Sequence, residues 1–415
     1  MRSNWTRRRG GASWVVDAYT LPLASLLLFG GSLGDRIGAQ RLFKIGALGF
    51  AMASVGCALS PSLAVLIVCR AAQGVFAALL LPMILALVGK SFDDPAHRAT
   101  AVNLLAVFGG SGMAIGPFLG GLLTDTASWR AVFWLTVPIA VTATVLAGHT
   151  DGPGDSSRRL HVDLPGQLTG TAGLVALVAG LIEAGSASSP FVSWGLISLG
   201  ALLLCAFVAI EHRVTMPMMP LSVFRAPGFP GAVLGGFALQ FGAYGLQFFL
   251  AVYLQAAWGV TAFTGGLLLA SFAIGVVLAG VVINPALQRR GARAMTLTGA
   301  TVAGIGTLAL LLVSGGHMWW LLLLAEFVIG IGTGIYSTAL NQTASCSLGY
   351  AAAGLGSGIY NTARQVGQSI GIAILGSFAH LTNQSLGFSM AIILVTGCAA
   401  AIVVTELRPR TTPGR

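Results

Sequence analysis

Long apolar runs recur along the whole chain, and they constrain its fold more than any other feature. Each run is about 20 residues long, which is the length of helix that crosses a lipid bilayer. Only 8% of the 415 residues are charged and 55% are hydrophobic, whereas a soluble domain carries about 25% charged residues. Such a chain cannot cover a water-facing surface. The sequence therefore predicts an all-α polytopic membrane protein.

The apolar runs predict thirteen helices, separated by short polar loops. They cover residues 14–33, 42–60, 62–90, 99–123, 129–148, 165–184, 191–211, 230–254, 262–285, 294–314, 317–341, 353–380 and 386–406. The most polar stretch, 148–166, separates five helices from a central pair, and six more helices follow. We expect an N-terminal bundle over 1–148, a cytoplasmic linker over 149–164, a central helix pair over 165–211 and a C-terminal bundle over 230–415.

Basic residues gather in alternate loops, so the net charge of +10 indicates topology rather than nucleic-acid binding. The basic loops and the C-terminal tail hold Arg36, Arg41, Lys44, Lys90, Arg98, Arg158, Arg159, Arg213, Arg225, Arg289, Arg290, Arg293, Arg408, Arg410 and Arg415. The other loops hold only Arg130. Because cytoplasmic loops are enriched in Lys and Arg, we place the basic set in the cytoplasm. The alternation then places the N-terminal tail and its four arginines outside, against this rule.

An internal repeat offers an explanation for the basic residues of the N-terminal tail. Residues 34–41 align with 287–294, with Arg36 on Arg289 and Gly38 on Gly291. The later copy follows two helices of its half, and the earlier copy follows one. If the halves are repeats, as in many transporters, one helix is missing before residue 14. Restoring it would return the N-terminus to the cytoplasm.

The segment 30–42 is predicted to form a tight cytoplasmic loop in which Gly34 and Gly38 allow sharp turns. Asp35 can accept hydrogen bonds from the N-terminus of a neighbouring helix, where the macrodipole favours an anion. Such a contact can hold one conformation and release it in another. The alternative is a solvated turn whose charges only set topology.

Arg70 lies well inside a membrane span, roughly 13 Å deep at the helical rise per residue. A charge at that depth is costly, so it must face a partner or a wet cavity. Gln73 follows on the next turn. Arg70 is therefore a candidate charge on the transport path, or else one half of a buried structural ion pair.

Three glycines, Gly112, Gly116 and Gly120, lie four residues apart on one helix face. This spacing allows a second helix to approach closely. Pro117 removes a backbone hydrogen bond and permits a bend, and Gly121 extends the pattern. Helix packing alone would explain the glycines.

Two acidic residues lie inside apolar spans. Glu326 is near the middle of 317–341, and Asp17 is in the outer part of the first span. An intramembrane carboxylate is a functional candidate, and its removal from water favours the protonated form, so each is a candidate proton carrier. As alternatives, Glu326 only neutralises Arg364, which is at mid-depth in 353–380, and Asp17 is an exposed interfacial residue.

Polar residues form two stripes at helical spacing, and both are candidates to line a wet cavity. The stripes are Gln240, Tyr244 and Gln247, and Asn361, Gln365 and Gln368. Hydrogen bonds between helices are the alternative for each. The sequence shows no nucleotide-binding loop, metal cluster or catalytic triad spacing. It predicts neither an enzyme nor an ATP-driven pump, and no cofactor or metal, with the proton gradient as the energy source.

These motifs together resemble the major facilitator superfamily, specifically its fourteen-helix drug:proton antiporters. The loop motif is matched by Gly31, Leu33, Asp35, Arg36 and Gly38, although Ala39 and Gln40 replace two usual basic residues. The fourth-helix motif is matched by Arg70, Gln73 and Gly74, and the antiporter motif by Gly112, Gly116, Pro117, Gly120 and Gly121. Residues 14–21 resemble the second helix of that family and 357–367 the eleventh. The acidic signature of its first helix has no match here.

The resemblance implies two helix bundles with two central linking helices, working by alternating access. It implies that Arg70 takes part in proton transfer and that Asp35 gates between inward-open and outward-open states. The expected function is export of a hydrophobic or cationic small molecule, such as an antibiotic, in exchange for protons. Export of an endogenous metabolite and a truncated, non-transporting protein are the alternatives. We expect a monomer in a bacterial cell membrane, with no nucleic-acid partner.

Overall fold

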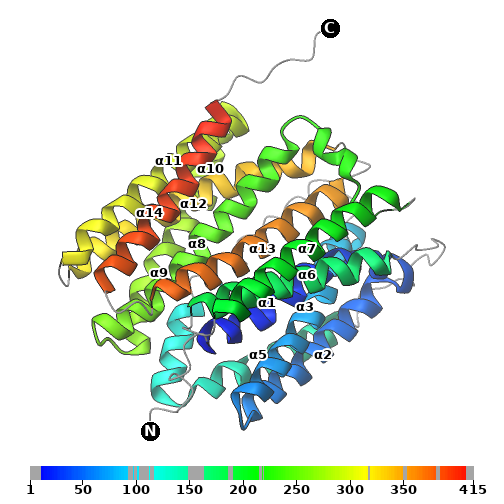
Figure 1. Cartoon of the computed structure of the whole chain (residues 1–415), viewed down its shortest axis with the longest axis horizontal. Coiled ribbons are helices and arrows are strands. Elements are labelled where there is room, and N and C mark those ends of the chain that lie inside the picture. Colours follow the sequence, from blue (N-terminus) through cyan, green and yellow to red (C-terminus); the bar gives the residue numbers. More distant parts are fainter. Residues whose placement is uncertain are drawn as a thin grey trace.

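The computed structural model describes residues 11–91, 116–147, 163–185, 190–214, 219–315, 318–348, 353–379 and 384–407, together with residues 97, 101, 112 and 217. Within these ranges the chain is helical apart from its connections and contains no strand. Nine helices in the described ranges are long and apolar enough to cross a membrane. The predicted all-α membrane fold is confirmed (Figure 1).

The long helices follow the predicted runs closely, with ends that move by a few residues. They are α1 (Gly11–Ile37), α2 (Ala39–Leu59), α3 (Leu63–Ser91), α5 (Trp129–Leu146), α6 (Leu164–Gly185), α7 (Pro190–Arg213), α8 (Phe229–Ala257), α9 (Ala262–Leu278), α11 (Gly291–Ala309), α12 (Trp319–Cys346), α13 (Ala353–Phe378) and α14 (Gln384–Leu407). A π-helical turn (Ala279–Ile283) and α10 (Asn284–Leu287) extend α9. The sequence predicts a helix over 99–123. Residues 116–126 are helical, and the earlier part of the prediction, apart from residues 101 and 112, lies outside the described residues.

The prediction of a loop over 30–42 is wrong, because α1 continues to Ile37 and α2 begins at Ala39. One residue, Gly38, makes the connection at φ 93°, a conformation that side-chain-bearing residues rarely adopt. Its N–H donates to the Gly34 carbonyl at 3.0 Å. The repeat partner Gly291 also has a positive φ, of 83°, at the start of α11.

The helices pack in two groups that lie on opposite sides of the molecule in Figure 1. The N-terminal bundle contains α1, α2, α3 and α5, and the C-terminal bundle contains α8, α9, α11, α12, α13 and α14. Within the C-terminal bundle, α8 and α13 approach closely where Gly367 faces the Phe237 carbonyl and Gly371 faces the Phe241 carbonyl. Helices α1 and α13 meet along the seam between the bundles.

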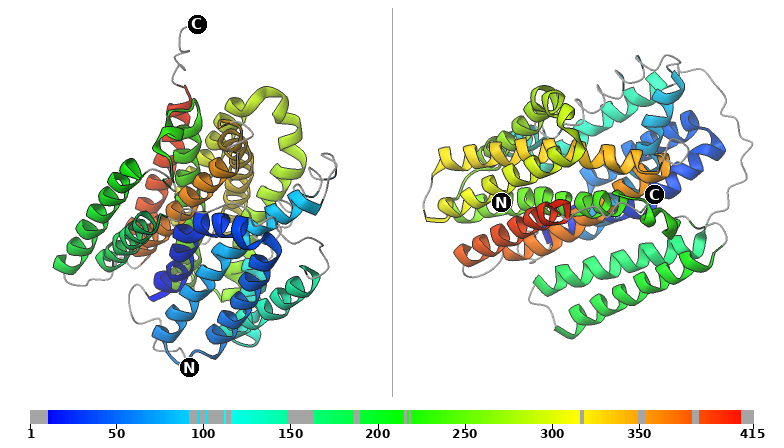
Figure 2. Two further views of the ribbon diagram at one scale, coloured as in Figure 1. Left: turned by 90° about the vertical axis from the view of Figure 1, so that its right-hand side faces the viewer. Right: turned by 90° about the horizontal axis from the view of Figure 1, so that it is seen from above.

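The central pair, α6 and α7, lies beside this seam (Figure 2). Val178 and Ile182 of α6 form one buried cluster with Leu21 of α1 and Ala373 of α13. The Gln167 side-chain amide of α6 also donates to a backbone carbonyl of α1 at 2.6 Å. Helix α6 therefore covers the seam and contacts both bundles.

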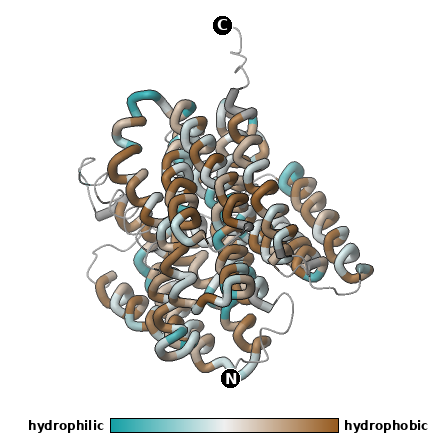
Figure 3. Tube along the Cα trace, turned by 90° about the vertical axis from the view of Figure 1, so that its left-hand side faces the viewer, coloured by the Kyte–Doolittle hydropathy of each residue, from teal (hydrophilic) through white to brown (hydrophobic). Residues whose placement is uncertain are grey.

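Large apolar side chains remain exposed on the outer faces of the helices, as Figure 3 shows by the brown colour along the tubes. Phe191 of α7 is 87% exposed and Met52 of α2 is 75% exposed. Exposure on this scale is unfavourable in water and suits contact with lipid.

Candidate functional site

Arg70 of α3 is held by neutral groups inside the N-terminal bundle. Its Nε donates to the Val15 carbonyl at 2.9 Å, and one terminal nitrogen donates to the Gln73 side chain at 2.9 Å. Its guanidinium lies over the Tyr19 ring, 4.5 Å from the centroid. The Gln73 amide in turn donates to Ser54 at 2.7 Å. No carboxylate of the described ranges pairs with Arg70, so the structural ion pair considered above is not present there.

Asp17 is fully buried at the seam, which rules out an exposed interfacial residue. The Thr20 hydroxyl, one turn along α1, donates to Asp17 Oδ1 at 3.2 Å. The same Thr20 oxygen lies 2.6 Å from the hydroxyl of Ser369 on α13. Asp17 Oδ2 is buried without a partner in the described part of the chain. This carboxyl is thus linked through one hydroxyl to the opposite bundle.

Glu326 is fully buried in the interior of the C-terminal bundle. The Gln247 amide of α8 donates to Glu326 Oε2, and Oε1 has no partner among the described residues. Arg364 instead donates to Asn361 at 3.3 Å and lies over the Tyr360 ring. The alternative in which Glu326 neutralises Arg364 is therefore wrong.

The two polar stripes do not line a single cavity. The Gln240 amide donates to Gln368 at 3.4 Å, which is a hydrogen bond between α8 and α13. Gln247 turns to Glu326, and the Asn361 amide donates to the Ser357 carbonyl of its own helix at 2.9 Å. Much of each stripe therefore serves helix packing. The amide oxygens of Gln240 and Gln365 are nevertheless buried without a donor in the described ranges.

The antiporter motif approaches the other bundle at Pro117 and Gly121. Gly121 faces the Ala262 backbone, and the Pro117 carbonyl faces Gly266 of α9. No described atom lies within 4 Å of a Cβ position on Gly112, Gly116 or Gly120. The close packing expected at those three glycines is therefore absent from the described structure, because the approach is made one residue along the helix, at Pro117 and Gly121.

Asp125 continues this contact at the end of the same helix. Its Oδ2 accepts a hydrogen bond from the Phe263 backbone N–H at 2.8 Å, which is an orphan donor of the first turn of α9. The rings of Phe118 and Phe263 also pack with centroids 5.5 Å apart. Asp125 is not among the residues expected from the sequence to be functional, although it follows the motif close to a loop poor in basic residues.

The glycines of the gating segment pack against α3. Gly34 leaves room for the Met83 side chain, and Gly31 faces Pro82 at 3.9 Å. Asp35 and Arg36 lie in the last turn of α1, and their side chains fall outside the described part of the structure. The gating role of Asp35 stays a prediction.

The contacts between bundles described above, through Ser369, Pro117 and Asp125, lie toward helix ends joined by loops that are poor in Lys and Arg. From the positive-inside rule we expect these ends to face outward. The bundles therefore touch on the side that the loop charges predict to be the outer one.

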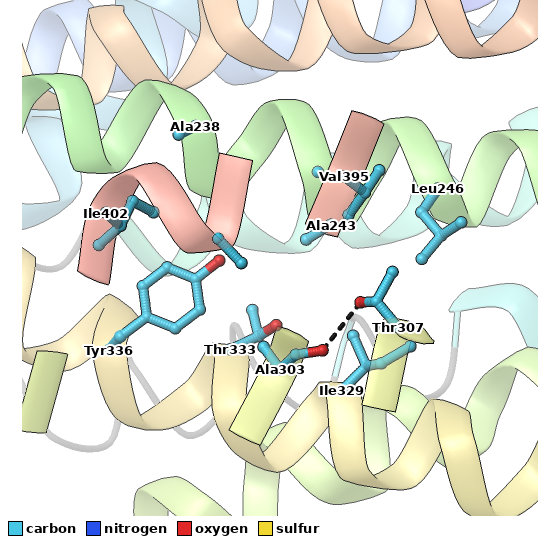
Figure 4. Close-up of a pocket in the computed structure, with 12 residues that line it drawn as sticks. Ala238, Ala243, Leu246, Ala303, Thr307, Ile329, Thr333, Tyr336, Val395 and Ile402 are labelled. Carbon is cyan, nitrogen blue, oxygen red and sulfur yellow. Dashed lines mark hydrogen bonds between the residues drawn. The ribbon is translucent and has the colours of Figure 1, made fainter. Parts of the chain in front are cut away.

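A cavity of about 20 Å³ lies inside the C-terminal bundle, between α8, α11, α12 and α14 (Figure 4). Its polar lining consists of the hydroxyls of Thr307, Thr333 and Tyr336. A space of this size holds about one water molecule, so it is too small for a drug. It contains none of the residues predicted to line the transport path.

Comparison with known proteins agrees with this architecture. The sequence profile of the Major Facilitator Superfamily matches residues 6–372 and 232–415. The methylenomycin A resistance protein of Streptomyces coelicolor is 32% identical over 375 residues, covering 90% of this chain and 78% of that protein. The multidrug efflux pump LfrA of Mycolicibacterium smegmatis is 32% identical, covering 88% and 72% respectively.

Among solved structures, a POT family transporter in complex with 5-aminolevulinic acid superposes with a TM-score of 0.72 at 16% identity. The alignment covers 96% of this chain and 89% of that one. At this identity the likeness concerns the fold. The helices, the profile match and the relatives together show that this chain is a multi-pass membrane protein that belongs to the major facilitator superfamily of transporters.

Proposed function

We propose that this protein exports drug-like small molecules across a bacterial plasma membrane in exchange for protons, by alternating access. The relatives named for antibiotic resistance and multidrug efflux support export of a drug. Such a transporter needs a proton site that is coupled to the opening and closing of one side of the membrane.

The observation that carries the proposal is the chain of hydroxyls from Asp17 to Ser369. Asp17 is a buried carboxyl, one oxygen of which has no partner among the described residues, and Thr20, which donates to the other oxygen, is also hydrogen-bonded to Ser369 of the opposite bundle. A change in the charge of Asp17 therefore alters the polarity of the same hydroxyl that joins the bundles. Proton binding and outer closure share one group, which is the linkage that antiport requires.

Arg70, Glu326 and Arg364 are further charged groups that the proposal places on or near the coupling path. Arg70 bonds to the carbonyl of Val15, two residues before Asp17, so it ties α3 to the helix that carries the seam carboxyl. Glu326 offers a second buried carboxyl in the other bundle. Of the two buried carboxyls, Asp17 is tested first, by replacing it with a side chain that cannot ionise.

The test uses inside-out vesicles in which export appears as uptake of ethidium and proton release from the lumen is followed with acridine orange. Wild-type protein should release protons when ethidium is added. Asp17→Asn keeps the size of the side chain but cannot ionise, so it should abolish this response, whereas Glu183→Gln at the far end of α6 should retain it. Wild-type proton release in Asp17→Asn would remove Asp17 from the mechanism, and wild-type protein without drug uptake would remove export itself.

A further inference from the structure

Arg364 of α13 is a half-buried cation whose hydrogen bonds are incomplete among the described residues. Its hydrogen bond to Asn361 on the same helix is long, at 3.3 Å. Its Nε is buried and has no acceptor in the described part of the chain. Its stem lies against Gly236 of α8, where a Cβ added to the glycine would be 3.2 Å from Arg364 Cγ. A buried guanidinium N–H without an acceptor is costly, so the site is built for a group that the protein itself does not supply.

Aromatic rings lie beside both arginines of the two bundles. The Arg364 guanidinium lies 5.6 Å from the centroid of the Tyr360 ring on its own helix. The Arg70 guanidinium lies 4.5 Å from the centroid of the Tyr19 ring on α1. Each arginine therefore faces a ring of its own bundle, and no carboxylate of the described residues pairs with it.

The buried acids do not balance these two cations. Glu326 is held by Gln247 and Asp17 by Thr20, and neither carboxyl has Arg70 or Arg364 among its interaction partners. In the described ranges these two arginines therefore carry positive charge that no carboxylate offsets. In a low-dielectric setting such charge attracts an anion strongly.

We propose that the Arg364 site binds an acidic group of the exported molecule, so that the substrate class is a lipophilic acid. This inference rests on the proposed export function. A guanidinium binds carboxylate, sulfonate or phosphate oxygens through two parallel hydrogen bonds. The unpaired oxygens of Gln240 and Gln365 accept from an O–H or N–H of the same ligand.

The charge of the substrate has a consequence for energetics. Export of an anion and import of a proton both move positive charge inward. The inside-negative membrane potential therefore drives both halves of the exchange. Export of a cation by one-for-one exchange would gain nothing from that potential.

The test compares fluorescein with rhodamine 123, which share a xanthene ring system but carry opposite charge. Binding to the full chain in lipid nanodiscs is measured by fluorescence anisotropy. Arg364→Gln should weaken fluorescein binding by about tenfold or more, the loss expected for a hydrogen bond to a charged group. Rhodamine 123 binding should be unchanged or stronger. Arg364→Lys keeps the charge but loses the two parallel N–H donors of the guanidinium. Its affinity for fluorescein should lie between those of the wild type and Arg364→Gln.

Arg290→Gln, at an exposed arginine of the turn before α11, is the matched control and should retain fluorescein binding. Size-exclusion profiles establish that each variant is folded. The inference is overturned if Arg364→Gln and the wild type bind fluorescein with the same affinity. It is also overturned if the wild-type protein binds rhodamine 123 and not fluorescein. Proton-coupled export of rhodamine 123 would still uphold the export function in that case.

Discussion

The hydroxyl oxygens of Thr20 and Ser369 lie 2.6 Å apart, and this hydrogen bond joins α1 to α13 across the seam between the bundles. Thr20 also donates to the buried carboxyl of Asp17. Because one hydroxyl serves both contacts, the charge of the carboxyl and the closure of the outer side are not independent. This relationship is the structural basis for coupling a proton to a conformational change.

A disulfide placed at this contact should lock the transporter. In a cysteine-free background, Thr20→Cys combined with Ser369→Cys should cross-link under mild oxidation, since the oxygens they replace are within hydrogen-bond distance. Dye export should stop on oxidation and return with reductant. Each single variant should be insensitive to both treatments. Full export by the cross-linked protein would mean that the seam does not open at this point.

Asp125 should act as a latch on the outer side. Asp125→Ala removes the acceptor for the Phe263 N–H and the charge that favours a helix N-terminus, a loss of about 0.3–1 kcal/mol or roughly two- to fivefold in the closed-to-open ratio. Labelling of Ser369→Cys by an impermeant maleimide should speed up accordingly. Asp125→Asn, which keeps an acceptor oxygen, should show less of this effect. Equal labelling rates in all three proteins would rule out a latch.

The glycines of the antiporter motif should differ sharply in their tolerance of alanine. A Cβ on Gly121 would meet the backbone of Ala262 and Phe263, whereas a Cβ on Gly116 meets no described atom. Gly121→Ala should therefore reduce export strongly by separating the bundles, and Gly116→Ala should leave it near the wild-type rate. Export assays on vesicles with matched protein content make the comparison. The reverse order of sensitivity would contradict the packing described here.

Gln247 and Glu326 should stabilise the C-terminal bundle as a pair. Gln247→Leu leaves a buried carboxyl without its donor, which should cost about 1–3 kcal/mol and lower the thermal midpoint. The double variant Gln247→Leu with Glu326→Leu should recover part of that loss, because no polar group is left unpaired. Additive losses in the thermal unfolding of the purified protein would show that the two side chains are independent.

Arg70 should tolerate no replacement, including lysine. The guanidinium uses two separate nitrogens, for the Val15 carbonyl and for Gln73, while it lies over Tyr19. Lysine keeps the charge but cannot reproduce this fork. Arg70→Lys and Arg70→Ala should both lose drug export while the protein still inserts into the membrane. Wild-type drug resistance in cells that express either variant would remove Arg70 from the transport path.

The sequence by itself determined the fold class, the positions of most helices and the candidate charged residues. These follow from local chemistry. A run of about 20 apolar residues spans a bilayer whatever its neighbours are, and an ionisable residue inside such a run stands out because its burial is costly. The length of α1 was misjudged because the glycines of 30–42 suggested a loop, whereas one positive φ at Gly38 was enough to connect two helices.

Only the tertiary structure decided which partner each of those residues has. Glu326 and Arg364 are both at mid-depth, yet Glu326 accepts a hydrogen bond from Gln247 and Arg364 lies over the Tyr360 ring. Thr20, Ser369 and Asp125 became functional candidates only when the helices from the two bundles were placed side by side. Periodicity fixes which residues share a face of one helix, but the rotation and offset of one helix against another arise from packing over the whole bundle.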